Sequence, residues 1–135
     1  MNVNERFLIG TTRFSDHTFN ENLTWRLKHK HDGCVYPLNK KIADTVPPNT
    51  LICVLEMNNS QNKIMGIGLI RNIYDMKQRI RVYNSDLNYN RFIYHSNKRV
   101  DRENIKWNQG LYTFSNSKFL HCIDNFYVSQ TSNKV

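Results

Sequence analysis

Cationic side chains gather in the middle third of the chain, where they could bind phosphate groups. Residues 71–103 contain eight Lys or Arg and four acids, so this stretch carries a local charge of +4. Arg79 and Arg81 alternate with apolar residues, a pattern that predicts a strand with one basic face and one buried face. If the strand that carries Arg91 aligns with it, the guanidinium groups form a row that meets phosphates two at a time.

The alternative interpretation is that these arginines lie on an ordinary solvated sheet face. Lys and Arg number 19 against 11 Asp and Glu, which gives a net charge of +8. Such an excess favours a polyanionic partner over a neutral one, and it brings the two interpretations to about equal weight. A guanidinium row would bind nucleic acid with strong salt dependence and little sequence preference.

A second basic group surrounds Trp25, which is followed by Arg26 and Lys28. An aromatic ring beside cations suits an unpaired nucleotide, because base stacking contributes about 1–3 kcal/mol and tolerates any base. The alternative is that Trp25 is a core residue. Further candidates for the walls of such a pocket are Tyr36, Tyr94, Trp107 and Phe114.

Metal-binding and catalytic patterns are weak in this sequence. His29, His31 and Cys34 form an H-x-H-x-x-C cluster, but the paired spacing of a structural zinc site is missing. The Gly66-x-Gly68 pair lacks the third glycine and the following helix of a dinucleotide fingerprint. With no C-x-x-C pair, the three cysteines are expected to be reduced. The sequence therefore supports no metal, cofactor or catalytic residue, and we expect a protein that is not an enzyme.

The elements that must position these residues are short. The clearest is an antiparallel hairpin of residues 50–56 and 64–71 around a polar loop, in which Gly66 and Gly68 leave a bare stripe open to another backbone or a ligand. Further strands are expected over residues 6–10, 78–83, 90–95, 111–114, 119–123 and 126–128. Short helices are expected over residues 15–30, where Asn20 can cap, and over 38–46 and 101–107.

This pattern predicts one α+β domain over residues 1–128, a small mixed, mostly antiparallel β-barrel with two or three short helices. Residues 129–135 are expected to form a short flexible tail. No apolar run reaches the length of a membrane helix, and the first ten residues are too polar for a secretory signal. A soluble, intracellular protein with no membrane partner is expected.

The order of elements resembles the PUA-like superfamily, small barrels that include the EVE, ASCH and YTH domains. The resemblance rests on RFLIGTT at residues 6–12, the helical stretch with Trp25, VPPNTLICV at 46–54 and KIMGIGLI at 63–70. Asn49 departs from the Gly or Asp that the family often has. Residues 89–94, 99–103 and 118–122 resemble uncharacterised members encoded by large DNA viruses.

The resemblance implies a curved sheet whose mouth, beside the helix after the first strand, holds a nucleotide or a modified base. Carried onto matching positions, Thr11, Thr12, Arg13 and Trp25 would border this pocket. The cations expected to contact the nucleic-acid backbone are Arg26, Lys28, Arg79, Arg81, Arg91 and Arg99.

The leading hypothesis is a nucleic-acid-binding module for RNA or single-stranded DNA, which could read a modified base. One alternative is a structural or interaction protein, such as a minor virion component with a protein partner. Another is a small nucleoside-modifying hydrolase of the ASCH type, although its Lys, Thr and Glu set cannot be assigned to residues here.

Overall fold

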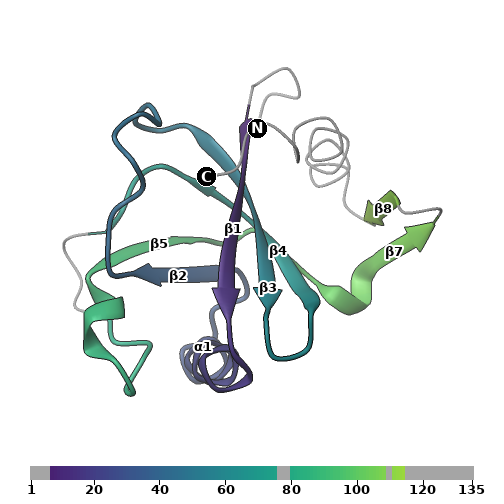
Figure 1. The fold of residues 1–135 in the computed structure, drawn as a ribbon, viewed down its shortest axis with the longest axis horizontal. Helices are drawn as coiled ribbons and strands as arrows, with labels where there is room; N and C mark the ends of the chain where they lie inside the picture. The colour runs from purple at the N-terminus through teal and green to yellow at the C-terminus, as the bar shows by residue number, and fades with distance from the viewer. Residues whose placement is uncertain (1–6, 76–79, 109–110, 115–135) are drawn as a thin grey trace.

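The computed structural model describes residues 7–75, 80–108 and 111–114, with side chains over 7–75 and 80–105. The strands are β1 (Phe7–Phe14), β2 (Cys34–Leu38), β3 (Leu51–Asn58), β4 (Lys63–Arg71), β5 (Phe92–Ser96), β6 (Arg99–Asp101), β7 (Ile105–Asn108) and β8 (Leu111–Phe114) (Figure 1). One α-helix, α1 (Asp16–Lys28), and two single 3₁₀ turns, η1 (Leu87–Asn90) and η2 (Arg102–Asn104), complete the described part of the chain.

The strands form an open, mostly antiparallel arrangement. The largest sheet has the order β1-β3-β4-β6, in which β1 runs parallel to β3 and the other pairs are antiparallel. β2 pairs with β5, and β7 pairs with β8. The expected α+β class is confirmed. The described strands do not close into a barrel, because β1 pairs only with β3 and β6 only with β4, which leaves the large sheet with two edges.

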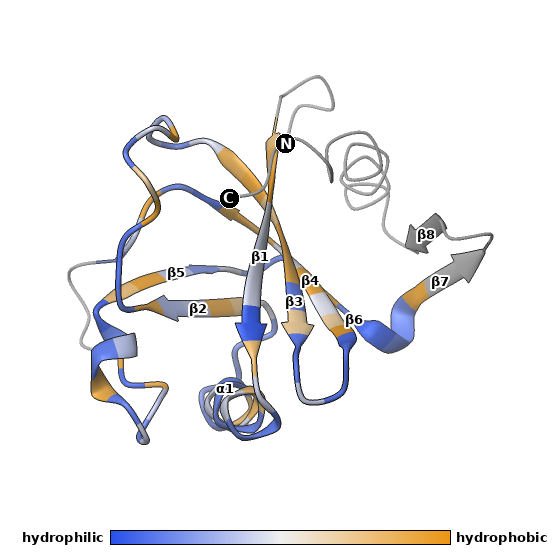
Figure 2. Cartoon of the chain, in the orientation of Figure 1, coloured by the Kyte–Doolittle hydropathy of each residue, from blue (hydrophilic) through white to orange (hydrophobic). Residues whose placement is uncertain are grey.

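β3 lies at the centre of the protein and is buried on both faces. Leu51, Cys53 and Leu55 point into one apolar cluster, whereas Ile52 and Val54 point into another. The second cluster holds β2, β5 and α1 against the large sheet, and Figure 1 shows β2 and β5 running crosswise to β1 and β3. The continuous apolar character of β3 and β4 is visible in Figure 2. A strand covered on both sides needs such a run in place of alternation.

α1 lies within the range 15–30 predicted for a helix, but its N-cap differs from the one predicted. Ser15 is the N-cap, and its Oγ accepts a hydrogen bond from the backbone N–H of Thr18 at 3.1 Å. The Thr18 Oγ1 accepts one in return from the N–H of Ser15 at 2.9 Å, which completes a capping box. Asn20, predicted as a possible cap, therefore lies inside the helix.

Three other predicted elements have a different structure. Residues 39–50 form turns and no helix, and Ile42 and Val46 pack against the core from this loop. Residues 80–83 run beside α1 without forming a strand. In place of the predicted helix over 101–107, η2 is followed by β7. The strands predicted at 119–123 and 126–128, and the tail at 129–135, lie outside the described residues.

Two further observations bear on the sequence-based expectations. Cys34 is a free, buried thiol, whereas Cys53 in β3 is disulfide-bonded, so the expectation of reduced cysteines is wrong for Cys53. Within residues 7–75, 80–108 and 111–114, no helix has the length and apolar character needed to cross a membrane.

Candidate nucleic-acid interface

A hollow between α1 and the segment 81–84 brings together three residues that the sequence marked for nucleic-acid binding. Trp25, Lys28 and Arg81 all line this hollow, which has a volume of about 450 Å³. Lys28 and Arg81 are exposed, and Trp25 is half-buried. We call this site the Trp25 hollow. It joins an aromatic ring and two cations from parts of the chain more than fifty positions apart.

The indole of Trp25 is partly exposed and packs against two histidine rings. Its ring stacks on the imidazole of His29, with 4.4 Å between ring centroids and 23° between planes. The ring of His31 meets it edge-on at 5.7 Å. The His29 ring is itself held, because its Nδ1 donates a hydrogen bond to the carbonyl oxygen of Trp25 at 2.8 Å. A base entering the hollow would extend a stack that already exists.

Glu21 and Asn90 hold the segment that carries Arg81. The Glu21 carboxylate accepts a hydrogen bond from the N–H of Asn84 at 2.6 Å and another from the hydroxyl of Ser85 at 2.8 Å. The Asn90 Oδ1 accepts from the N–H groups of Val82 and Tyr83, each at 2.9 Å. Its Nδ2 donates to the carbonyl oxygen of Tyr83 at 2.7 Å. These side chains satisfy the backbone N–H and C=O groups that strand pairing would satisfy in a sheet.

The pKa of Glu21 reflects this arrangement. Partial burial raises the pKa of the carboxyl, but the bonds from Asn84 and Ser85, together with the nearby His17, lower it by more. The net pKa lies below the ordinary value of 4.5, so the carboxylate is charged at neutral pH. Ser85 and Asn84 are thus held by charge-assisted hydrogen bonds.

A second site lies along β1, where the resemblance placed a pocket. Thr11 and Thr12 line two adjoining hollows, of about 570 Å³ and about 460 Å³, which also share Leu38. The first is mainly aliphatic and includes the rings of Tyr36 and Tyr94. The second is rich in hydroxyl groups and includes Arg13, Tyr83 and Tyr89. We call the pair the β1 groove.

The segment 81–86 separates the Trp25 hollow from the β1 groove. Arg81 and Asn84 line the hollow on one side, whereas Tyr83, Ser85 and Asp86 line the groove on the other. One tethered segment therefore supplies walls to both sites. An extended ligand that crosses this segment would contact both of them.

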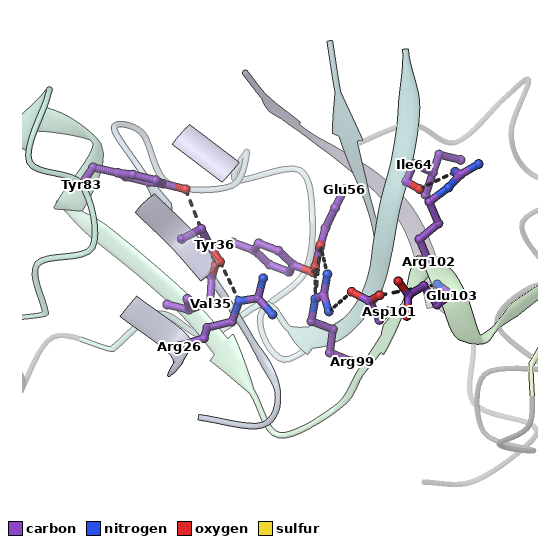
Figure 3. A network of polar contacts seen from close by, with 11 residues as sticks. Arg26, Val35, Tyr36, Glu56, Ile64, Tyr83, Arg99, Asp101, Arg102 and Glu103 are labelled. Carbon is purple, nitrogen blue, oxygen red and sulfur yellow. Dashed lines mark hydrogen bonds and ion pairs between the residues drawn. The ribbon is translucent and has the colours of Figure 1, made fainter. Parts of the chain in front are cut away.

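Arg99 does not belong to an exposed basic row. Its side chain is only 6% exposed and forms a two-pronged ion pair with Glu56, with Nη2 2.7 Å from Oε1 and Nε 3.0 Å from Oε2 (Figure 3). Its Nη1 donates to Asp101 at 3.0 Å, and Tyr36 donates its hydroxyl to Glu56 at 2.5 Å. The expectation that Arg99 contacts nucleic acid is wrong, because the fold already uses all three of its nitrogens.

The space beside the two glycines of β4 is filled by this network. A Cβ at Gly66 would collide with the guanidinium of Arg99, and one at Gly68 would collide with the hydroxyl of Tyr36. The bare stripe predicted from the sequence exists, but the protein's own side chains occupy it. Gly66 and Gly68 therefore belong to packing and not to a ligand site.

The remaining predicted cations are dispersed. Arg26 is a buried residue of α1, and its Nε donates to the Oδ1 of Asn22 at 2.9 Å. Arg91 is exposed and lies over the ring of Phe92 at 5.6 Å, outside the Trp25 hollow. Arg79 lies outside the described residues. The predicted row of Arg79, Arg81 and Arg91 required aligned strands, but no strand carries Arg81 in the described part of the chain.

Sequence reasoning missed the residues that support the site. Glu21, Asn90 and Glu56 carried no expectation, although each now fixes an arginine or its segment. A signal was present for Glu56 alone, as the acid that ends the apolar run TLICVLE.

Among the residues with described side chains, no three His, Cys, Asp or Glu gather in a metal-binding group. Comparisons with protein-family models, curated proteins and solved structures found no significant match.

Proposed function

We propose that this protein binds single-stranded nucleic acid, RNA or DNA, at the Trp25 hollow. The observation that supports this proposal is the convergence of Trp25, Lys28 and Arg81 on one hollow in a chain with a net charge of +8. A base stacks beside the Trp25–His29 pair, and the two cations neutralise the adjoining phosphates. Because only two described lysine or arginine side chains line the hollow, we expect binding to involve contacts with few phosphates.

The β1 groove extends this proposal to the neighbouring nucleotide. Its aliphatic part, with Tyr36 and Tyr94, has the size and lining of a small-molecule pocket and suits a base. Its hydroxyl-rich part, with Arg13, suits a sugar and phosphate. Reading of a modified base would take place in the aliphatic part.

A PUA-like relationship forms part of the same proposal. The order of elements supports it, because α1 directly follows β1 and the β3–β4 hairpin adds to β1. Binding is favoured over nucleoside hydrolysis, since the buried carboxylate of Glu56 is fully occupied by Arg99 and Tyr36. A virion role would need a protein partner, for which no surface in the described residues argues specifically.

Photo-crosslinking tests the proposal directly. Purified protein is irradiated with mixed RNA and DNA oligonucleotides, and the attached residue is mapped by mass spectrometry. We expect the attachment in peptides that contain Trp25 or residues 81–89, and we expect Arg81→Ala to reduce its yield. Lys63→Ala, which removes an exposed charge outside the hollow, is the matched control and should not reduce it. Absence of attachment, or attachment confined to other surfaces, contradicts the proposal.

A further inference from the structure

Arg26 is a buried cation that lies over the ring of Phe19, at 5.9 Å from the ring centroid, and forms no ion pair with a described carboxylate. It lies in the last turn of α1 and is 7% exposed. Only its Nε is bonded, to the Oδ1 of Asn22 at 2.9 Å. Asn22 is in turn fixed, because its Nδ2 donates to the carbonyl oxygen of Val35 at 2.8 Å and lies 3.2 Å from the hydroxyl of Tyr83. The orientation of the Arg26 guanidinium is therefore set from one side by a rigid amide.

The outer edge of this guanidinium has no acceptor in the described part of the chain. Nη1 and Nη2 of Arg26 make no hydrogen bond there, and no described carboxylate lies within 4.0 Å of them. Every fully buried side-chain nitrogen in the described residues does have a partner, so the two Nη atoms must reach the solvent. Nη1 and Nη2 of Arg26 thus carry four N–H donors that no described residue accepts, on a guanidinium edge with the shape for two parallel hydrogen bonds.

Arg99 provides the comparison within the same chain. Its burial is similar, but its guanidinium is bonded to the carboxylates of Glu56 and Asp101. The Glu56 carboxylate is already engaged by Arg99 and Tyr36. Figure 3 shows Arg26 beside this network. Burial lowers the pKa of Arg26, Arg99 lowers it further, and Glu56 offsets part of the effect. Arginine nevertheless remains protonated, and both carboxylates of this network, Glu56 and Asp101, are bonded to Arg99 and not to Arg26.

We propose that Arg26 binds a phosphate group through Nη1 and Nη2. A phosphate offers two oxygens to the guanidinium edge and keeps its other oxygens free for water, whereas a carboxylate would commit both of its oxygens. The bound anion would supply the acceptor that Nη1 and Nη2 of Arg26 lack among the described residues. This inference does not depend on the Trp25 hollow, because Arg26 does not line it.

Thermal unfolding in inorganic phosphate, against sodium chloride of equal ionic strength, tests the inference. Phosphate at about 100 times its Kd should raise the Tm of the wild-type protein by roughly 10 °C. Arg26→Met, which keeps much of the side-chain volume but removes the charge, should abolish this rise. Lys63→Met changes the net charge equally and should retain it. A rise of the same size in Arg26→Met, or none in the wild-type protein, overturns the inference.

A measurement on the wild-type protein guards against a variant that fails to fold. The side-chain ¹⁵N resonances of Arg26 should shift on titration with inorganic phosphate, while those of Arg99 stay in place. Two further arms identify the source of the phosphate: a dinucleotide with a 5′-phosphate and the same dinucleotide without it. A shift with the phosphorylated form alone points to a terminal phosphate of a nucleotide. If no ligand moves the Arg26 resonances, the guanidinium is merely hydrated and the proposal is wrong.

Discussion

At the scale of single residues, one carboxylate organises the interior. Glu56 is 2% exposed and meets both Arg99 and Tyr36, while Gly66 and Gly68 provide the space that those two side chains fill. The sequence could not reveal this arrangement, since Glu56 and Arg99 lie 43 positions apart. An arginine whose three guanidinium nitrogens already donate to carboxylates has no nitrogen free for a ligand. Arg81 forms no ion pair with a described acid and is exposed at the Trp25 hollow.

Glu56→Gln should destabilise the fold strongly. The amide keeps the shape of the carboxylate but removes the charge that compensates Arg99, and breaking a buried ion pair in this way costs about 3–5 kcal/mol. Chemical denaturation measures the loss. The double variant Glu56→Leu/Arg99→Met should recover part of it, because both charges of the buried pair are then removed together. A cost below about 1 kcal/mol for Glu56→Gln would mean that water solvates Arg99 in the folded protein.

At the scale of elements, the sequence predicted best where local pattern and long-range packing agree. The β3–β4 hairpin was predicted because two apolar runs flank a polar loop, and tertiary contacts reinforce that choice. The spacing of Leu38, Ile42 and Val46 suggested a helix, but an irregular loop brings the same side chains to the core. The alternation around Arg81 suggested a strand, yet the side chains of Asn90 and Glu21 satisfy that backbone instead.

Glu21→Gln should loosen the segment that carries Arg81. The bonds to Asn84 and Ser85 lose their charge, so we expect faster hydrogen exchange at the Asn84 amide and a loss of about 1–3 kcal/mol. Glu103→Gln, at an exposed carboxylate in η2, is the control and should change neither.

The same carboxylate makes the segment sensitive to acid. The folded state lowers the pKa of Glu21, so its contribution to stability is present above the unfolded value of about 4.5 and is lost as the pH falls through the folded pKa. Amide exchange at Asn84 in the wild-type protein should therefore accelerate below about pH 4.5 relative to neighbouring sites, after correction for intrinsic rates. Glu21→Gln should remove this additional acceleration. A variant that keeps it would assign the acid response to another group.

At the scale of the whole molecule, the chain has 19 basic and 11 acidic residues, but only two of the described lysines and arginines, Lys28 and Arg81, line the Trp25 hollow. Arg99 and Arg26 are buried, and Arg91 lies away from the Trp25 hollow, so Lys28 and Arg81 carry the electrostatic part of binding there. Charge composition directs attention to a polyanionic partner as a hypothesis. It could not say which cations share a surface, because that depends on partners far apart in the chain.

The salt dependence of binding distinguishes cations at the site from the diffuse charge of the protein. The logarithm of affinity for a single-stranded oligonucleotide should fall linearly with the logarithm of salt concentration, and Arg81→Ala should flatten the slope by roughly one unit, because one phosphate contact is lost. Trp25→Ala should weaken binding through lost stacking and leave the slope unchanged. Arg91→Ala is the charge-matched control, with an exposed cation outside the hollow. If fluorescence anisotropy gives the same slope change for Arg81→Ala and Arg91→Ala, binding follows the general field of the molecule and the Trp25 hollow has no special role.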